Sequence, residues 1–176
     1  TRVAAGSEAT DAVNKAQLDA VAESAAGAAK YFSAQGEAGS DTGAWSEGEG
    51  ALAAGSASNA VGDGALAQGA GASALGNDAV ALGRNTFAEG TGSVAIGGLG
   101  QAFDEYNQPV VDADGNPVLT GTSAVANSTA VGNAAQATGV DSNALGAGAQ
   151  ATGDNSFAGG VKSRATGGYS VALGDS

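Results

Sequence analysis

The chain has 176 residues, of which 31 are glycine, and it contains no cysteine, methionine or histidine. Without cysteine there are no disulfides and no thiolate chemistry, and without histidine a Ser-His-Asp triad is excluded as well. A zinc site of the usual kind also lacks its ligands. The net charge of −12 argues against nucleic acid or an anionic membrane as a direct partner. We therefore expect no catalytic residue, no cofactor and no metal site.

Targeting signals are also missing from the sequence. It shows no signal peptide, no long apolar run and no initiating methionine, so we expect a segment of a longer protein.

The first regular pattern along the chain is a helical heptad. Thr10 or Asp11 is the predicted N-cap, and extending the heptad backwards places Asn14 at a d position. The pattern fits either an amphipathic helix packed on its own domain or a short parallel coiled coil. We favour the coiled coil, because alanine at core positions lets chains approach closely. The a and d positions are Leu18, Val21, Ala25, Ala28 and Phe32.

A heptad repeat of another kind fills most of the remaining chain. The tripeptide Ala-x-Gly returns every seven residues over 53–97 and again over 130–174, and the position four before each glycine is always small. In an extended segment these three positions share one face. A coiled coil would need large apolar residues there instead, so each unit is predicted to be a short strand with a glycine turn. Trp45 precedes the repeat, and we expect it to cover the open end of the first coil.

The other face of these units alternates between polar and apolar pairs from one heptad to the next, which makes the true period fourteen residues. The sequence thus predicts a mainly β fold, a parallel β-roll solenoid with two short strands per coil and coils about 4.8 Å apart. Its interior of small residues buries little apolar area, while one face carries an apolar stripe of a size that marks an interface. Closed two- or three-fold symmetry would bury this stripe along an axis. The interface residues are Leu66, Val80, Leu82, Val94, Ile96, Val131, Leu145, Phe157, Val171 and Leu173.

Residues 98–121 interrupt the repeat. The segment 110–119 is predicted to be a β-hairpin with an Asp-Gly turn. The run Asp112–Asn116 has glycine in the fourth place, whereas an EF-hand calcium loop needs it in the sixth. We therefore predict a turn here rather than a calcium loop. Insertions on one face of a solenoid often carry binding sites. The candidate partner-binding residues are Phe103, Asp104, Glu105 and Tyr106.

Two stretches resemble a known family. Residues 3–18 resemble the neck motif of trimeric autotransporter adhesins, whose core reads Asp-Ala-Val-Asn-x-x-Gln-Leu, as in Asp11–Leu18. The units Ser93–Gly97 and Ser170–Gly174 are similar to the head repeats of the YadA type. The resemblance implies a left-handed roll in a homotrimer on the bacterial surface, with necks joining a wide head to a narrow stalk. Contact with the outer membrane would be made only through an anchor domain outside this segment.

The expected organisation is a neck (1–17), a short trimeric coiled-coil helix (18–33), a first part of the head (34–97), the insertion (98–121) and a second part of the head (122–176). The implied function is non-enzymatic attachment to host cells or extracellular matrix.

Three other functions stay open at this point. The chain could be a structural spacer that displays a distal adhesive tip. An acyltransferase on a left-handed β-helix is disfavoured, because that fold uses six-residue rungs and generally a histidine base. An ice-binding solenoid is suggested by the column Thr138, Thr152 and Thr166, but glutamine and arginine side chains beside this column make a poor flat array.

Overall fold

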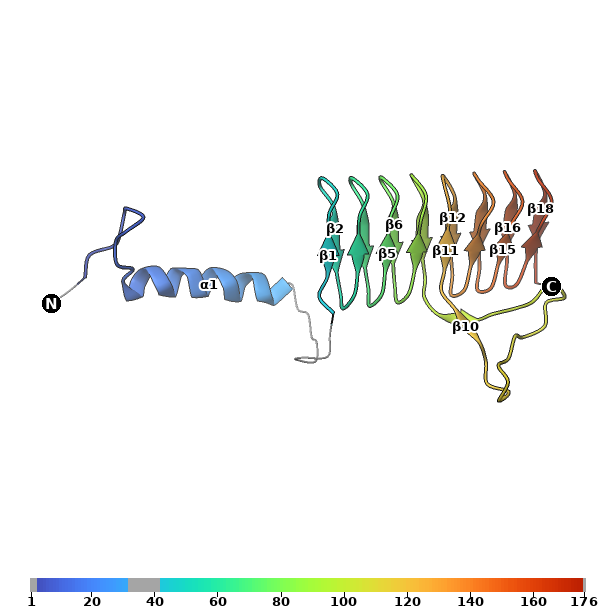
Figure 1. The fold of residues 1–176 in the computed structure, drawn as a ribbon, viewed down its shortest axis with the longest axis horizontal. Helices are drawn as coiled ribbons and strands as arrows, with labels where there is room; N and C mark the ends of the chain where they lie inside the picture. Colours follow the sequence, from blue (N-terminus) through green and yellow to red (C-terminus); the bar gives the residue numbers. More distant parts are fainter. Residues whose placement is uncertain (1–2, 32–41, 176) are drawn as a thin grey trace. The chain divides into compact units, whose positions relative to one another are not determined.

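The computed structural model describes residues 3–31 and 42–175. They belong to two compact units, Thr1–Glu37 and Ala38–Ser176. The first unit holds a loop and the helix α1 (Lys15–Tyr31), and the second is built from short strands (Figure 1). Among the described residues, no helix is long and apolar enough to cross a membrane.

Helix α1 begins one residue after Asn14. The Asn14 Oδ1 accepts the Gln17 backbone N–H at 3.0 Å, and the Gln17 Oε1 accepts the Asn14 backbone N–H at 3.2 Å. This reciprocal pair is a capping box. The prediction of Thr10 or Asp11 as N-cap is therefore wrong, because Asn14 caps the helix. The Asp11 carboxylate is already used in the preceding turn, where it accepts the N–H groups of Ser7 and Glu8.

The predicted a and d row of α1 is uncovered in the single chain. Leu18 is 62% exposed and Val21 is 66% exposed. The side chain of Ala28 and the whole of Phe32 lie outside the described residues. A helix with so little apolar surface buried gains stability chiefly by packing its apolar row against another element.

The second unit is a stack of coils that form two parallel eight-stranded sheets, here named sheet A and sheet B. Residues fourteen apart are paired, as in Leu66 with Val80, which confirms the predicted β-roll of 14-residue coils. Sheet A contains β1 (Trp45–Ser46), β3 (Asn59–Ala60), β5 (Ser73–Ala74), β7 (Phe87–Ala88), β11 (Ser123–Ala124), β13 (Gln136–Ala137), β15 (Gln150–Ala151) and β17 (Arg164–Ala165). Sheet B contains β2 (Leu52–Ala54), β4 (Leu66–Gln68), β6 (Val80–Leu82), β8 (Val94–Ile96), β12 (Thr129–Val131), β14 (Asn143–Leu145), β16 (Phe157–Gly159) and β18 (Val171–Leu173).

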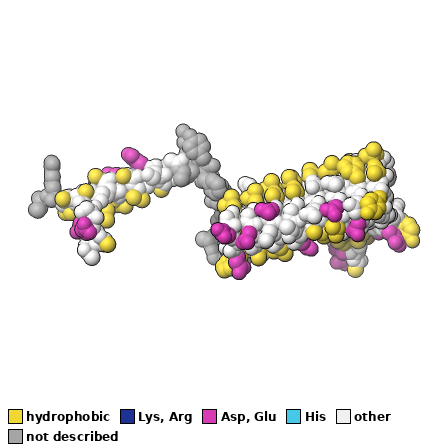
Figure 2. Space-filling model, turned by 90° about the horizontal axis from the view of Figure 1, so that it is seen from above, with side chains coloured by type: hydrophobic (Ala, Val, Ile, Leu, Met, Phe, Trp, Pro, Cys, Tyr) yellow, Lys and Arg dark blue, Asp and Glu magenta, His cyan; other side chains and the backbone are white. Residues whose placement is uncertain are grey.

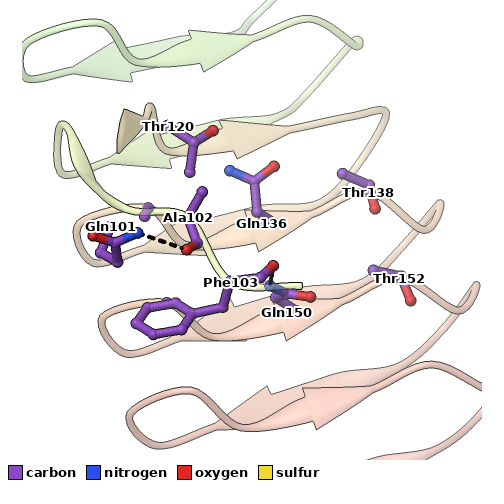
Figure 3. A pocket seen from close by; sticks show the side chains of 10 residues that line it. Gln101, Ala102, Phe103, Thr120, Gln136, Thr138, Gln150 and Thr152 are labelled. Carbon is purple, nitrogen blue, oxygen red and sulfur yellow. Dashed lines mark hydrogen bonds between the residues drawn. The ribbon is translucent and has the colours of Figure 1, made fainter. Parts of the chain in front are cut away.

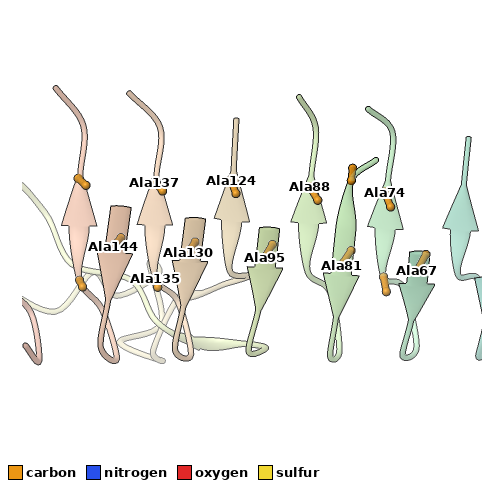
Figure 4. Packing of buried hydrophobic residues seen from close by; sticks show 14 of the residues in the cluster. Ala67, Ala74, Ala81, Ala88, Ala95, Ala124, Ala130, Ala135, Ala137 and Ala144 are labelled. Carbon is orange, nitrogen blue, oxygen red and sulfur yellow. The ribbon is translucent and has the colours of Figure 1, made fainter. Parts of the chain in front are cut away.

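The interior between the sheets is filled by small side chains. Its buried hydrophobic residues are all alanine, and its buried polar residues are all serine or threonine (Figure 4). The hydroxyls bond to backbone carbonyls of the turns or strands, as when Ser142 Oγ donates to the Gly139 oxygen at 2.6 Å. The turns are equally tight, because a Cβ on Gly62 would lie 2.0 Å from the Gly76 oxygen in the next coil.

Residues 98–121 leave the roll and return to it at one point. Within them β9 (Gly100–Gln101) pairs antiparallel with β10 (Leu119–Thr120). The buried Thr122 hydroxyl accepts the Gly98 N–H at 3.1 Å and donates to the Gly132 oxygen at 2.6 Å. These bonds fix the two ends of the insertion beside each other, and β11 then resumes pairing with β7 in register.

Trp45 does not cover the end of the roll. It is paired with Asn59 in β3 and is 61% exposed. The register puts it in the column whose side chains point away from the interior, so the interpretation of Trp45 as a cap is wrong.

Candidate functional site

The predicted interface residues all lie on one sheet and point away from its interior. Ile96, Val131 and Leu145 are neighbours in register on adjacent strands, and they are 37%, 37% and 39% exposed. Figure 2 shows hydrophobic side chains in a row along one long side of the β unit. Half-buried members of the stripe are Leu66, Val80, Leu82, Val94 and Phe157, and exposed members are Ile96, Val131, Leu145, Val171 and Leu173. No described segment covers this stripe.

The stripe is continuous even where the sequence places a glycine in it. Gly159 follows Leu145 in the column, and the Phe157 ring lies so close that a Cβ on Gly159 would meet it at 2.7 Å. The same Cβ would lie 3.0 Å from Leu173. The aromatic ring therefore fills the gap that the missing side chain leaves.

The insertion is built around two aspartates with identical roles. Asp104 Oδ1 accepts the N–H groups of Tyr106 and Gln108 at 2.9 and 2.8 Å, and the Asp104 N–H donates to the Gln108 oxygen at 3.0 Å. Asn107 completes this loop with a φ of 61°. The loop is thus closed by its own carboxylate and backbone.

The second loop repeats this arrangement eight residues later. Asp112 Oδ1 accepts the N–H groups of Asp114 and Asn116 at 2.9 and 2.8 Å, and Gly115 has a φ of 82°. The backbone hydrogen bond from Asn116 is the largest cause that lowers the pKa of the Asp112 carboxyl. Among the described residues, no three acidic side chains gather into a possible metal site.

Sequence reasoning missed this tandem organisation. The signal was present, because an aspartate recurs at 104 and 112 and Pro-Val recurs at 109–110 and 117–118. Gln101 joins the two loops, since its Nε2 lies 2.7 Å from the Val110 oxygen and 3.0 Å from the Ala102 oxygen.

The first loop is anchored on the outer face of sheet A. The Arg164 Nη1 donates to the Asp104 carbonyl at 2.8 Å, and the Gln150 Nε2 lies 3.4 Å from the Phe103 carbonyl. The Lys162 Nζ lies 4.4 Å from the centre of the Phe103 ring, within cation–π range.

The four predicted partner-binding residues consequently divide into two pairs. Phe103 packs on the roll, and the Asp104 carboxylate is used inside its own loop. Glu105 and Tyr106 face the solvent, with Tyr106 75% exposed.

The polar residues of the neck motif hold the loop before α1. The Gln17 side chain accepts the Gly6 N–H and donates to the Gly6 carbonyl, both at 3.0 Å. The backbone N–H of Ser7, followed by that of Glu8, lowers the pKa of the Asp11 carboxyl. The polar side chains of the motif therefore have structural roles, at Asp11, Asn14 and Gln17. The neighbouring apolar side chains Val13 and Leu18 are exposed.

Comparisons with known families match two family models to different parts of the chain. Residues 1–41 match the coiled stalk of trimeric autotransporter adhesins. The YadA head domain repeat matches five overlapping stretches, which are 60–86, 74–99, 126–149, 137–160 and 151–176. The search of individual curated proteins gives no match. The stalk and head models together cover more than half of the chain. Members of this family are non-enzymatic adhesins. The match implies a homotrimer that is displayed as a surface-exposed passenger. The chain therefore belongs to the trimeric autotransporter adhesins, with a YadA-like stalk and head.

Proposed function

We propose that this segment attaches a bacterium to host cells or to extracellular matrix, as a homotrimer with sheet B facing the three-fold axis. The observation that carries the proposal is the contrast between the two sheets. Sheet B presents an uncovered apolar stripe along its whole length. The outer face of sheet A is polar from β13 to β17, where the insertion lies on it, and its exposed apolar side chains are confined to the first half, at Trp45, Leu75 and Phe87. Burying the stripe leaves sheet A and the three insertions directed outwards.

The proposed segment order along the chain places a neck and a coiled coil before the head. Residues 1–17 form the neck and 18–33 the coiled coil, with the head in 34–97 and 122–176 and the insertion in 98–121. The attachment surface is assigned to Glu105 and Tyr106, which extend from a loop that its own hydrogen bonds keep rigid. A pre-ordered loop loses little conformational entropy on binding, which favours affinity.

Attachment would draw on three copies of this surface. Each copy alone can be weak, because linked sites gain avidity when the geometry lets them engage together. A spacer function is the second candidate, and the near-identical coils favour it, since they extend the stack without adding a distinct site.

The test is adhesion of the purified trimer to cultured host cells and to immobilised matrix proteins. We expect the trimer to attach, and a Tyr106→Ala variant to attach several-fold less. A Tyr169→Ala variant is the matched control, because Tyr169 is also exposed, at 82%, but lies outside the insertion. A trimer that attaches to no cell and no matrix protein would instead support the spacer function.

A further inference from the structure

A groove of about 280 Å³ lies between the insertion and the outer face of sheet A. The strand that leads into the first loop forms one wall, and the neighbouring strands β13 and β15 form the floor (Figure 3). The residues that line it are Gln101, Ala102, Phe103, Thr120, Ala134, Gln136, Thr138, Gly148, Gln150 and Thr152.

This lining contains no charged residue, although the chain has 18 acidic and 6 basic ones. The nearest basic side chains are already engaged, with Arg164 on the Asp104 carbonyl and Lys162 over the Phe103 ring. Neither an anionic nor a cationic ligand finds a partner of opposite charge inside the groove. The surface is built for neutral hydrogen bonding.

The amides and hydroxyls of the groove retain capacity to bind a ligand. Gln136 uses one N–H to reach the Gly121 carbonyl at 2.7 Å, which leaves its second N–H and its carbonyl oxygen. The exposed hydroxyls of Thr138 and Thr152 make no hydrogen bond to any described residue and point the same way in Figure 3. Each hydroxyl can donate one hydrogen bond and accept two.

These groups also repeat in space. The tripeptide Gln-Ala-Thr occurs at 136–138 and 150–152, and Gln136 is paired with Gln150 in the parallel ladder. The hydroxyls of Thr138 and Thr152 are therefore spaced by one strand separation, about 4.8 Å, along the stack. Gln150 differs from Gln136 in that its amide already bonds to the Phe103 carbonyl and to Arg164. An extended peptide repeats its side chains on one face only about every 6.6 Å, so its period does not match.

We propose that this groove binds an uncharged, hydroxyl-rich oligosaccharide lying along the stack, with Thr138, Thr152 and Gln136 as its hydrogen-bonding partners. Each pyranose unit of such a chain carries several neutral hydroxyls, which can donate and accept hydrogen bonds as the uncharged lining of the groove requires. The proposal rests on the attachment function and names the class of host molecule that this part of the head contacts.

The test is calorimetric titration of the whole trimer with three neutral hexasaccharides, namely cellohexaose, chitohexaose and maltohexaose. At least one is expected to bind, and the double variant Thr138→Val, Thr152→Val should weaken it about tenfold or more, because two hydroxyl partners are lost without a change of shape. Ser73→Ala is the control, since Ser73 lies on β5 of the same sheet but outside the groove. It should bind like the native protein.

Three results would overturn the inference: binding of none of the three hexasaccharides, unchanged binding by the valine variant, or preferential binding of a sulfated heparin hexasaccharide. Adhesion of the same proteins to host cells separates the two proposals. A native trimer that attaches to cells but binds no neutral hexasaccharide keeps the attachment function and removes the oligosaccharide site.

Discussion

Replacing Ile96 by aspartate tests whether sheet B faces the trimer axis. Ile96 lies in the middle of the stripe and is 37% exposed in the single chain. Full burial of such a side chain stabilises by about 1.5–3 kcal/mol, so covering its exposed third contributes about 0.5–1 kcal/mol per protomer. Across three protomers the substitution removes about 1.5–3 kcal/mol of apolar burial.

The introduced carboxylate adds a larger penalty. Three aspartates would meet at the axis with Val131 and Leu82 beside them and with no partner of opposite charge on the stripe. An uncompensated buried charge costs about 3–5 kcal/mol. The combined loss raises the dissociation constant of the trimer at least about a thousandfold, because each 1.4 kcal/mol is roughly a factor of ten.

Sedimentation equilibrium of the whole chain over a range of concentrations measures this shift. The control is Leu75→Asp, since Leu75 is 43% exposed but follows β5 on sheet A. We expect the Ile96→Asp chain to dissociate at concentrations where the native chain and the Leu75→Asp chain stay trimeric. An Ile96→Asp trimer as tight as the native one would refute the assignment of sheet B to the axis, and equal dissociation of both variants would show that the stripe has no special role.

Three further predictions concern the parts that hold the segment together. In Gly139→Ala the new Cβ would lie 2.1 Å from the Gly153 oxygen, so urea unfolding should show a loss of about 3 kcal/mol. Gly167→Ala occupies the same turn position, but its Cβ meets nothing closer than 3.8 Å, so its stability should stay within about 0.5 kcal/mol. The folded-state pKa of Asp112 is lowered, so its stabilisation of the second loop is complete above its unfolded pKa of about 3.9 and is lost as the pH falls through the folded value. The NMR amide signals of this loop should therefore shift on acidification. In Asp112→Asn this pH-dependent shift should be absent. Gln17→Ala removes both hydrogen bonds to the neck loop, and hydrogen exchange at the start of α1 should accelerate about fivefold or more.

The roll was predictable because its spacing is dictated by contact between backbones. A Cβ on Gly76 would lie 2.2 Å from the backbone of Gly90, so the turn glycines recur at the coil period and show it in the sequence. The interior follows the same rule, since two sheets this close leave room only for alanine, serine and threonine. These steric constraints recur in every coil, so they produce a repeat that can be recognised from the sequence alone.

The insertion and the neck were less predictable, for two different reasons. The position of the first loop depends on Lys162, which lies over the Phe103 ring, and on Arg164, which donates to the Asp104 carbonyl. Both are distant in the sequence and reach the loop only because the coils stack. The start of α1 was misplaced because Asp11 and Asn14 are both good N-cap residues. Only the path of the preceding loop shows that the Asp11 carboxylate is occupied, which leaves Asn14 to cap the helix.

The composition of the interior has a consequence for how this head is assembled. A core of alanine and serine removes little apolar surface from water, and the largest fully buried side chains are threonines. The larger apolar side chains, such as Ile96 and Leu145, lie on the stripe that we propose the trimer buries, so in this arrangement much of the hydrophobic stabilisation becomes available only on association. Folding of the head and formation of the trimer are then coupled, and its apparent stability rises with protein concentration. The same coupling links adhesion to assembly, because a chain that fails to trimerise loses both the multivalent attachment surface and much of the stability of the roll that carries it.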